Sequence, residues 1–231
     1  MQIQWLGHSA FKIADGDTRI LIDPFLNGNP KFTGDYAATI ADATHVCLTH
    51  MHNDHFGDTM DILRRTKAKL VCLVEIADWV GGKLGTANVV DINFGGTAIV
   101  DGVAVSLVPA VHTSGLTMED GTAVFGGVSA GLVIGVGDHT IYHMGDTTIF
   151  GDMALIDELH HPDIGIVPIG GHYTMDARIA ALAVNRYFNF DTVLPCHYLT
   201  FPLLAQSADA FVAAVKGPNV LTPAPMETVE V

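Results

Sequence analysis

The stretch Val46-Cys47-Leu48-Thr49-His50-Met51-His52-Asn53-Asp54-His55 joins a short apolar run to three histidines and an aspartate. If a strand ends in this loop, it can present His50 and His52 to one metal ion, because alternate residues of an extended chain point the same way. The following turn can present Asp54 and His55 to a second ion. Polar groups this dense would be costly to bury without partners. Imidazole and carboxylate ligands in this mix suit zinc, and also manganese, iron or nickel.

Length and composition favour a globular protein with a large core. The chain has 231 residues, 49% of them hydrophobic, and we expect one domain over residues 1–231. The formal net charge of −14 disfavours binding to nucleic acid or to an anionic membrane, although bound cations would still attract a small phosphate-bearing substrate. Three scattered cysteines and the lack of a signal-peptide or membrane-span pattern are typical of a cytoplasmic protein with no membrane partner.

Hydrophobic periodicity predicts two runs of short strands, each followed by strand–helix units. The first run is an antiparallel meander, and the second contains a hairpin turned at Gly137-Asp138. The expected strands are 3–6, 10–13, 18–22, 45–48, 70–74, 89–92, 98–100, 103–108, 129–136, 140–143, 164–168 and 192–195, and the expected helices are 58–66, 75–83, 153–159, 176–188 and 208–215. Sheets inside and helices outside give an α+β fold, a four-layer αββα sandwich. Proline and glycine from residue 217 onward predict a loose C-terminal end.

Three further candidate ligands follow predicted strands. His112 comes after the strand at 103–108, Asp146 after the strand at 140–143 and His197 after the strand at 192–195. A metal ligand on this architecture should lie where a strand ends in a loop, and a carboxylate can bridge two cations with its two oxygens. The expected ligands are His50, His52, His112 and Asp146 for one ion, and Asp54, His55, Asp146 and His197 for the other.

These motifs, in this order, resemble those of the metallo-β-lactamase superfamily. The resemblance rests on the block at 50–55, His112, Gly145-Asp146-Thr147 and His197, and on Leu21-Ile22-Asp23-Pro24, which is similar to that superfamily's first motif. The segments 5–11 and 168–175 are similar to a branch of small metal-dependent hydrolases related to ascorbate-6-phosphate lactonases. The resemblance implies the αββα fold and hydrolysis, and it leaves the substrate open.

The chain departs from several better-known branches of that superfamily. Flavodiiron proteins place Glu where this chain has His52, which argues against a redox di-iron role. Nucleases of the β-CASP type carry a large inserted domain, and the interval from Asp146 to His197 is too short to hold one. Glyoxalase II-like thioesterases add a helical C-terminal domain, whereas a short tail follows His197 here. True β-lactamases are usually exported, and no export signal is visible.

The expected mechanism is hydrolysis by a metal-activated water. Two divalent ions, zinc first and manganese, iron or nickel as alternatives, would lower the pKa of a shared water towards ~7. Asp54 would orient this water and pass on a proton while also binding metal. His172 would donate a hydrogen bond to the oxyanion or hold a substrate phosphate or carboxylate, on a loop that Gly170-Gly171 lets approach closely. Asp23 is expected behind a metal-bound imidazole, and His8 as a structural or substrate-side group.

Three functions stay open at this point. The first is hydrolysis of a small ester, lactone or phosphoester. The second is a metallo-phosphodiesterase or ribonuclease acting on nucleic acid, which the acidity of the chain disfavours. The third is a non-catalytic metal-binding protein, against which the intact ligand sets argue. Whether the protein forms a homo-oligomer is also open. We interpret the basic cluster at 64–69 as a solvated helix end and Cys196 as a buried residue rather than a nucleophile.

Overall fold

The computed structural model describes residues 1–231. Its first sheet combines an antiparallel meander with parallel strands. Its strand order is β16-β1-β2-β3-β4-β5-β6, antiparallel from β16 to β3 and parallel from β3 to β6. Its strands are β1 (Gln2–Gly7), β2 (Ala10–Asp15), β3 (Thr18–Ile22), β4 (His45–Cys47), β5 (Lys69–Leu73), β6 (Val89–Ile92) and β16 (Thr228–Glu230). Its helices are α1 (Tyr36–Ile40), α2 (Asn53–Phe56), α3 (Thr59–Arg65) and α4 (Val74–Leu84).

The second sheet repeats this plan. Its order is β15-β14-β13-β12-β11-β8-β7, antiparallel from β7 to β12 and parallel from β12 to β15. Its strands are β7 (Thr97–Val100), β8 (Val103–Pro109), β11 (Ala130–Val136), β12 (His139–His143), β13 (Ile164–Pro168), β14 (Thr192–Cys196) and β15 (Asn219–Val220). Its helices are α5 (Met153–His160), α6 (Ala177–Tyr187) and α7 (Asp209–Ala214). A separate two-stranded ribbon pairs β9 (Gly115–Thr117) with β10 (Ala123–Phe125).

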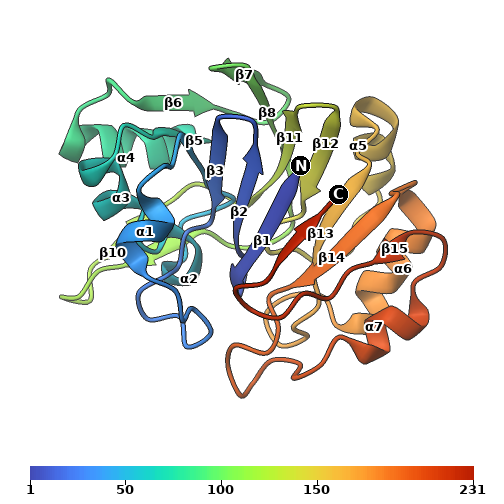
Figure 1. Cartoon of the computed structure of the whole chain (residues 1–231). Coiled ribbons are helices and arrows are strands. Elements are labelled where there is room, and N and C mark those ends of the chain that lie inside the picture. The colour runs from blue at the N-terminus through green and yellow to red at the C-terminus, as the bar shows by residue number, and fades with distance from the viewer.

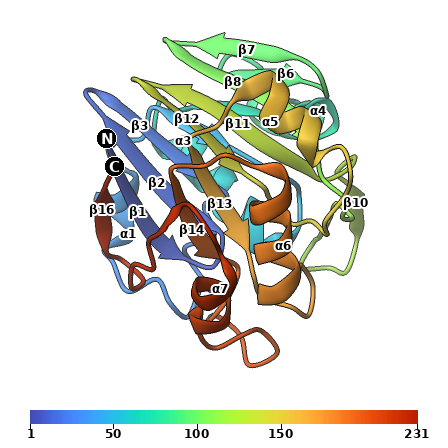
Figure 2. The same cartoon turned by 90° about the vertical axis from the view of Figure 1, so that its right-hand side faces the viewer.

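The two sheets lie between two layers of helices (Figure 1). Helices α3 and α4 lie on one side and α5 to α7 on the other, and the turned view shows α6 and α7 in front of the second sheet (Figure 2). This arrangement confirms the predicted four-layer αββα sandwich. Every residue of β4 and of β13 is buried, as expected for parallel strands covered on both faces.

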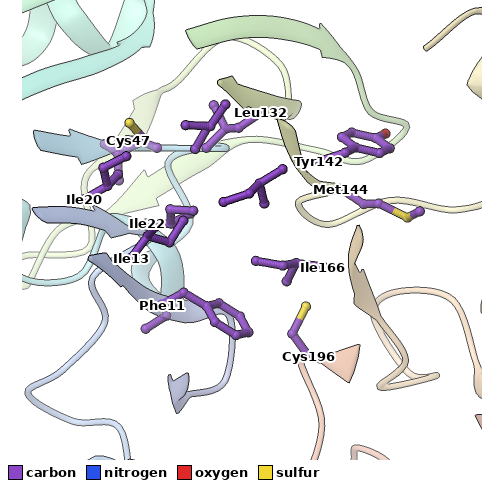
Figure 3. Packing of buried hydrophobic residues seen from close by; sticks show 14 of the residues in the cluster. Phe11, Ile13, Ile20, Ile22, Cys47, Leu132, Tyr142, Met144, Ile166 and Cys196 are labelled. Carbon is purple, nitrogen blue, oxygen red and sulfur yellow. The ribbon is translucent and has the colours of Figure 1, made fainter. Parts of the chain in front are cut away.

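The core lies between the sheets. Side chains from both sheets meet there, among them Ile20 and Ile22 of β3, Leu132 of β11 and Ile166 of β13 (Figure 3). Each of these four side chains is fully buried. Full burial of one such side chain contributes about 1.5–3 kcal/mol. The apolar interior therefore fixes the two sheets relative to each other and, with them, the loops at their ends.

The C-terminal end differs from the expectation of a loose tail. β16 pairs antiparallel with β1, with Val229 opposite Ile3. The Gln4 side chain donates a hydrogen bond to the carbonyl of Met226 at 2.9 Å, and the N-terminal amine donates one to the carbonyl of Val231 at 3.1 Å. The prediction was wrong because the proline- and glycine-containing segment before β16 is a connection that returns the chain to the sheet edge.

The carboxyl ends of four strands deliver the predicted ligands to one edge of the sandwich. β4 leads into residues 50–55, β8 into His112, β12 into Asp146 and β14 into His197. In doubly covered α/β sheets, ligands bind outside the carboxyl ends of parallel strands, where loops meet without breaking a ladder. No helix of the structure is long and apolar enough to cross a membrane.

Candidate metal centre

One group of imidazoles forms where β4 ends. His50 Nε2 and His52 Nδ1 lie 3.0 Å apart, and the ring centroid of His112 lies 5.3 Å from that of His50 and 5.2 Å from that of His52. One nitrogen of each ring lies within 4.8 Å of the others. His50 is buried, whereas His52 and His112 are half-buried and border the open side. Three imidazoles that converge in this way suit a divalent transition metal.

A second group forms around the short helix α2. Asp54 and His55 of α2, His197 after β14 and His8 from the β1–β2 turn each place one ligand atom within 4.8 Å of the others. The rings of His8 and His197 lie 4.1 Å apart, centroid to centroid. Asp54, His55 and His197 were predicted together, whereas His8 was not among the expected ligands.

Asp146 lies between the two groups and is buried. Its Oδ2 is 3.2 Å from His197 Nε2, 3.5 Å from His112 Nε2 and 4.0 Å from His50 Nε2, and its Oδ1 is 3.3 Å from His55 Nε2. The carboxylate thus contacts or faces imidazoles of both groups.

Two facing atoms in this centre have no hydrogen-bond partner. His55 Nε2 and Asp146 Oδ1 are both buried and unpartnered, although they lie 3.3 Å apart. A buried polar atom without a partner costs on the order of 1–3 kcal/mol. A metal cation would engage both atoms, and imidazole nitrogen with carboxylate oxygen is a donor set that such ions prefer. The residues present therefore fit a metal centre.

Asp23 orients the imidazoles from behind. Its carboxylate accepts hydrogen bonds from His55 Nδ1 at 2.7 Å, from the Thr49 hydroxyl at 2.6 Å and from the Thr49 backbone amide at 2.8 Å. The Thr49 oxygen in turn lies 2.9 Å from His50 Nδ1. Because the hydroxyl proton goes to Asp23, His50 Nδ1 carries a proton and donates it to Thr49. His50 then turns an unprotonated Nε2 towards the centre, the arrangement that a metal-bound histidine needs, and a cation at His55 Nε2 would take the place of a proton there. Asp23 thus lies behind an imidazole as predicted, and its support of a bound metal stays a prediction.

The carboxylates make the centre attractive to cations. Burial lowers the pKa of His55, but Asp146 and Asp23 outweigh this effect and raise the pKa well above its ordinary value. His50 is also buried, and its pKa is lowered, since desolvation and the neighbouring His55 outweigh the attraction of Asp146. The pKa of Asp146 is held well below its ordinary value against the effect of burial, because His197 and His55 lie beside it.

His8 connects the centre to the loop after β14. Its Nε2 lies 3.1 Å from Asp54 Oδ2 and its Nδ1 lies 3.1 Å from the Thr200 hydroxyl. Burial and the nearby His197 lower the pKa of His8 to about 4, despite the hydrogen bond to Asp54. A neutral His8 therefore donates from Nε2 to Asp54, which can only accept. The signal in the sequence was a histidine in a short turn, Gly7-His8-Ser9, between two apolar strands.

The structure places His172 at the outer margin. Its ring is exposed and packs edge-on against Tyr173, with centroids 4.5 Å apart, and it does not join either imidazole group. The expected close approach of the glycine loop is confirmed at Gly170, where a Cβ would collide with the carbonyl oxygen of His197. The predicted contact between His172 and a substrate oxyanion stays a prediction.

Two further interpretations agree with the structure. Cys196 is fully buried and its thiol pKa is raised well above the ordinary value by burial, which does not suit a nucleophile. In the basic cluster, Arg65 pairs with Asp61 at 2.6 Å and Lys69 with Asp101 at 2.8 Å, all on the surface and away from the centre.

A cavity of about 670 Å³ opens over the centre. Its floor is made of candidate ligands, and the rest of its lining is made of side chains that were not predicted as site residues. The floor residues are His52, Asp54, His112, Asp146 and His197, and the others are Phe25, Asn53, Thr113, Tyr173, Phe201, Pro202 and Leu203. A volume of this size accommodates a small organic molecule.

Comparison with known proteins agrees with this geometry. Residues 2–197 match the family described as "Beta-lactamase superfamily domain". Proteins named "UPF0173 metal-dependent hydrolase" are 52% identical over 226 residues in Methylocella silvestris, covering 97% of each chain, and 48% identical over 234 residues in Chelativorans sp., covering both chains completely.

The fold comparison gives the same result. The solved structure of Igni18, a metallo hydrolase from the archaeon Ignicoccus hospitalis, superposes with a TM-score of 0.84 at 33% identity and covers 99% of this chain and 97% of that one. Taken with the ordered ligands at the strand ends, these matches show that the chain belongs to the metallo-β-lactamase superfamily, as one of its metal-dependent hydrolases.

Proposed function

We propose that this metal-dependent hydrolase uses two divalent ions to add water to a small ester, lactone or phosphoester. The observation that carries the proposal is the position of Asp146, whose two oxygens lie 3.2–4.0 Å from imidazoles of both ligand groups. A single-ion site would not require a buried carboxylate surrounded on both sides by histidines.

The ligand assignment follows from the two groups. His50, His52 and His112 would hold one ion, Asp54, His55 and His197 the other, and Asp146 both. Zinc suits these ligands best, and manganese, iron or nickel are alternatives. Bound there, the ions would lower the pKa of a water and polarise the substrate oxygen. Asp23, which is engaged with His55 and Thr49, would stay behind the rings as a positioning residue.

The remaining chemistry falls to Asp54. Its side chain is 36% exposed and lines the cavity, so that it can contact a water above the floor. The hydrogen bond from His8 helps hold the pKa of Asp54 below its ordinary value against the effect of burial, and it fixes the carboxylate as a proton acceptor. We assign to Asp54 the orientation of the attacking water and the acceptance of its proton. His172 would contribute at most a hydrogen bond at the outer margin.

Metal content is the first measurement. Protein purified without chelator should hold about two ions per chain, and His50→Ala should lose one or both together with the hydrolysis of p-nitrophenyl esters and bis(p-nitrophenyl) phosphate. Leu159→Ala, an exposed residue of α5 outside the cavity, is the matched control and should keep the wild-type metal content. One ion per chain in fully active wild-type protein would contradict the two-ion proposal.

Nucleic acid is the less supported substrate. A nuclease needs cations that follow a phosphate backbone. The net charge is −14, and no lysine or arginine lines the cavity. A nuclease assay tests this ranking. If the protein degraded single-stranded RNA faster than it hydrolysed esters, and Asp146→Ala lost that activity, nucleic acid would become the better-supported substrate.

The domain organisation and the cellular location of the enzyme are also proposals. We treat residues 1–231 as one domain, because each ligand group takes residues from both sheets. Cys47, Cys72 and Cys196 are free and buried, which agrees with a reducing compartment such as the cytoplasm.

A further inference from the structure

The cavity has one wall without any charged side chain. Phe25 comes from the loop after β3, Tyr173 from the loop after β13, and Phe201, Pro202 and Leu203 from the loop after β14. Leu203 is 62% exposed and Tyr173 56% exposed, although both are large side chains. Large apolar groups left uncovered beside a catalytic floor mark a surface that a ligand covers.

This wall is held close to the centre. The rings of Phe25 and Phe201 lie 6.5 Å apart, and Phe201 packs edge-on against His8 at 5.4 Å, centroid to centroid. The loop is fixed by backbone hydrogen bonds from Leu204 to the carbonyl of Phe201 at 3.0 Å and from Ala205 to the carbonyl of Gly170 at 2.9 Å. The apolar surface is therefore already formed beside Asp54, through its contact with His8.

The polar side of the cavity offers few partners to a charged substrate group that lies away from the reacting bond. None of the 11 lysines and arginines of the chain lines it. The Asn53 side chain already donates to the carbonyl of Thr117 at 2.9 Å and accepts from its amide at 3.1 Å. Thr113 and the Tyr173 hydroxyl are the remaining uncharged polar groups. A carboxylate or phosphate remote from the reacting bond would lose hydration here without gaining a cationic partner.

We propose that the substrate is a neutral ester or lactone with an apolar acyl group that lies against Phe25, Phe201 and Leu203, an inference that rests on the hydrolase function proposed above. Hydrolysis adds one water across the acyl carbon–oxygen bond, which breaks, and yields a carboxylate, an alcohol and one proton. Substrates whose distal end carries a charge are disfavoured, whichever its sign.

Three p-nitrophenyl esters of matched chain test this preference on the metal-loaded protein. The hexanoate is apolar, the adipate monoester has a terminal carboxylate, and the 6-(trimethylammonio)hexanoate has a fixed positive charge. We expect kcat/KM for the hexanoate to exceed that for each charged ester by about 10- to 100-fold, because a charge against this half-exposed wall loses part of its hydration and gains no partner. The cationic ester distinguishes two explanations of a low rate for the adipate ester. General repulsion of anions by an acidic protein would slow only the adipate, whereas the apolar wall would slow both charged esters.

A charge placed on the wall should reverse one preference. Leu203→Lys should raise kcat/KM for the adipate ester by about tenfold and lower it for the hexanoate. Leu203→Gln, of similar length and no charge, should lower the hexanoate value without raising the adipate value. Leu159→Lys, which adds the same charge on α5 outside the cavity, should leave both values unchanged. Leu203 is exposed, and thermal unfolding of each variant checks that the fold is retained.

The outcomes separate the two proposals. Equal kcat/KM for all three esters, or the highest value for the cationic ester, overturns the apolar substrate class while the hydrolase stands, provided that Asp146→Ala abolishes turnover. Hydrolysis of bis(p-nitrophenyl) phosphate without any turnover of the hexanoate also overturns it. If Asp146→Ala keeps full ester hydrolysis, the metal-dependent site itself is not responsible, and both proposals fail.

Discussion

The floor and the wall of the cavity are built in opposite ways. On the floor, Asp146 and His197 are buried, and they lie against each other with Oδ2 and Nε2 3.2 Å apart. On the wall, Leu203 and Tyr173 are more than half exposed, and no side chain is charged. The floor lies at the ends of strands, whereas the wall lies on loops. The proposed chemistry thus lies at the ends of strands, and the proposed substrate selection lies on loops, which can vary without disturbing the strands.

The largest effect should come from breaking the floor at Asp146. Asp146→Asn keeps the shape of the side chain but removes the negative charge that faces four imidazoles. We expect metal content to fall and kcat/KM for an ester to drop ~10³-fold, since metal ions supply several kcal/mol of transition-state stabilisation. Metal analysis and kinetics on the same preparation measure both. Wild-type activity in a metal-free variant would contradict the role of the floor.

A change behind the floor should have a smaller effect. Asp23→Asn replaces an acceptor of three hydrogen bonds by an amide that conflicts with His55 Nδ1–H or with Thr49. Loss of such a supporting partner typically weakens metal affinity by about 10–100-fold. Competition with a chelator of known affinity measures the change. Asp42→Asn, a surface carboxylate paired with Lys12, is the control, and an equal loss there would show that the effect is general.

His8 lies at the boundary between floor and wall, and its removal should sharpen the distinction. His8→Ala deletes the donor to Asp54 and the ring that packs on Phe201. We expect kcat to fall by about tenfold while the ion held by His50, His52 and His112 stays bound, because a hydrogen bond to a charged group contributes about 1.5–3 kcal/mol. His8→Gln, which can still donate, should recover part of kcat. Loss of all metal in His8→Ala would instead make His8 a ligand of the whole centre.

The smallest effect should come from the outer margin. His172 is exposed and packs on Tyr173, so His172→Ala should lower kcat/KM by only about 2- to 10-fold, the contribution of one solvent-accessible hydrogen bond. Kinetics at several pH values with unchanged metal content would measure it. A loss above about 100-fold would show that the loop closes and brings this ring to the oxyanion.

The floor could be predicted from sequence and the wall could not, for physical reasons. A ligand block after a buried strand is a local pattern, and strand periodicity then locates His112, Asp146 and His197 at the same edge. The wall depends on how the loop after β14 folds back onto Phe25 and His8, residues far away in the chain. No periodicity records such a contact.

Short elements were missed for a related reason. α1 has five residues and α2 four, too few for a helical period to appear. α1 depends instead on Asp35, whose carboxylate accepts a hydrogen bond from the amide of Ala38 at 2.9 Å. β16 has three residues and forms only because the edge of β1 is available to it.

The two ligand groups also bear on how the protein matures. His50 and His52 follow a strand of the first sheet and His112 one of the second, and Asp54 and His55 are likewise separated from His197. Each bound ion would therefore act as a cross-link between halves that leave the ribosome at different times. An ion captured early would be held by an incomplete set of ligands. Full metal retention would then report that both halves have docked, and the proposed metal centre would serve as a checkpoint of assembly as well as a place of reaction.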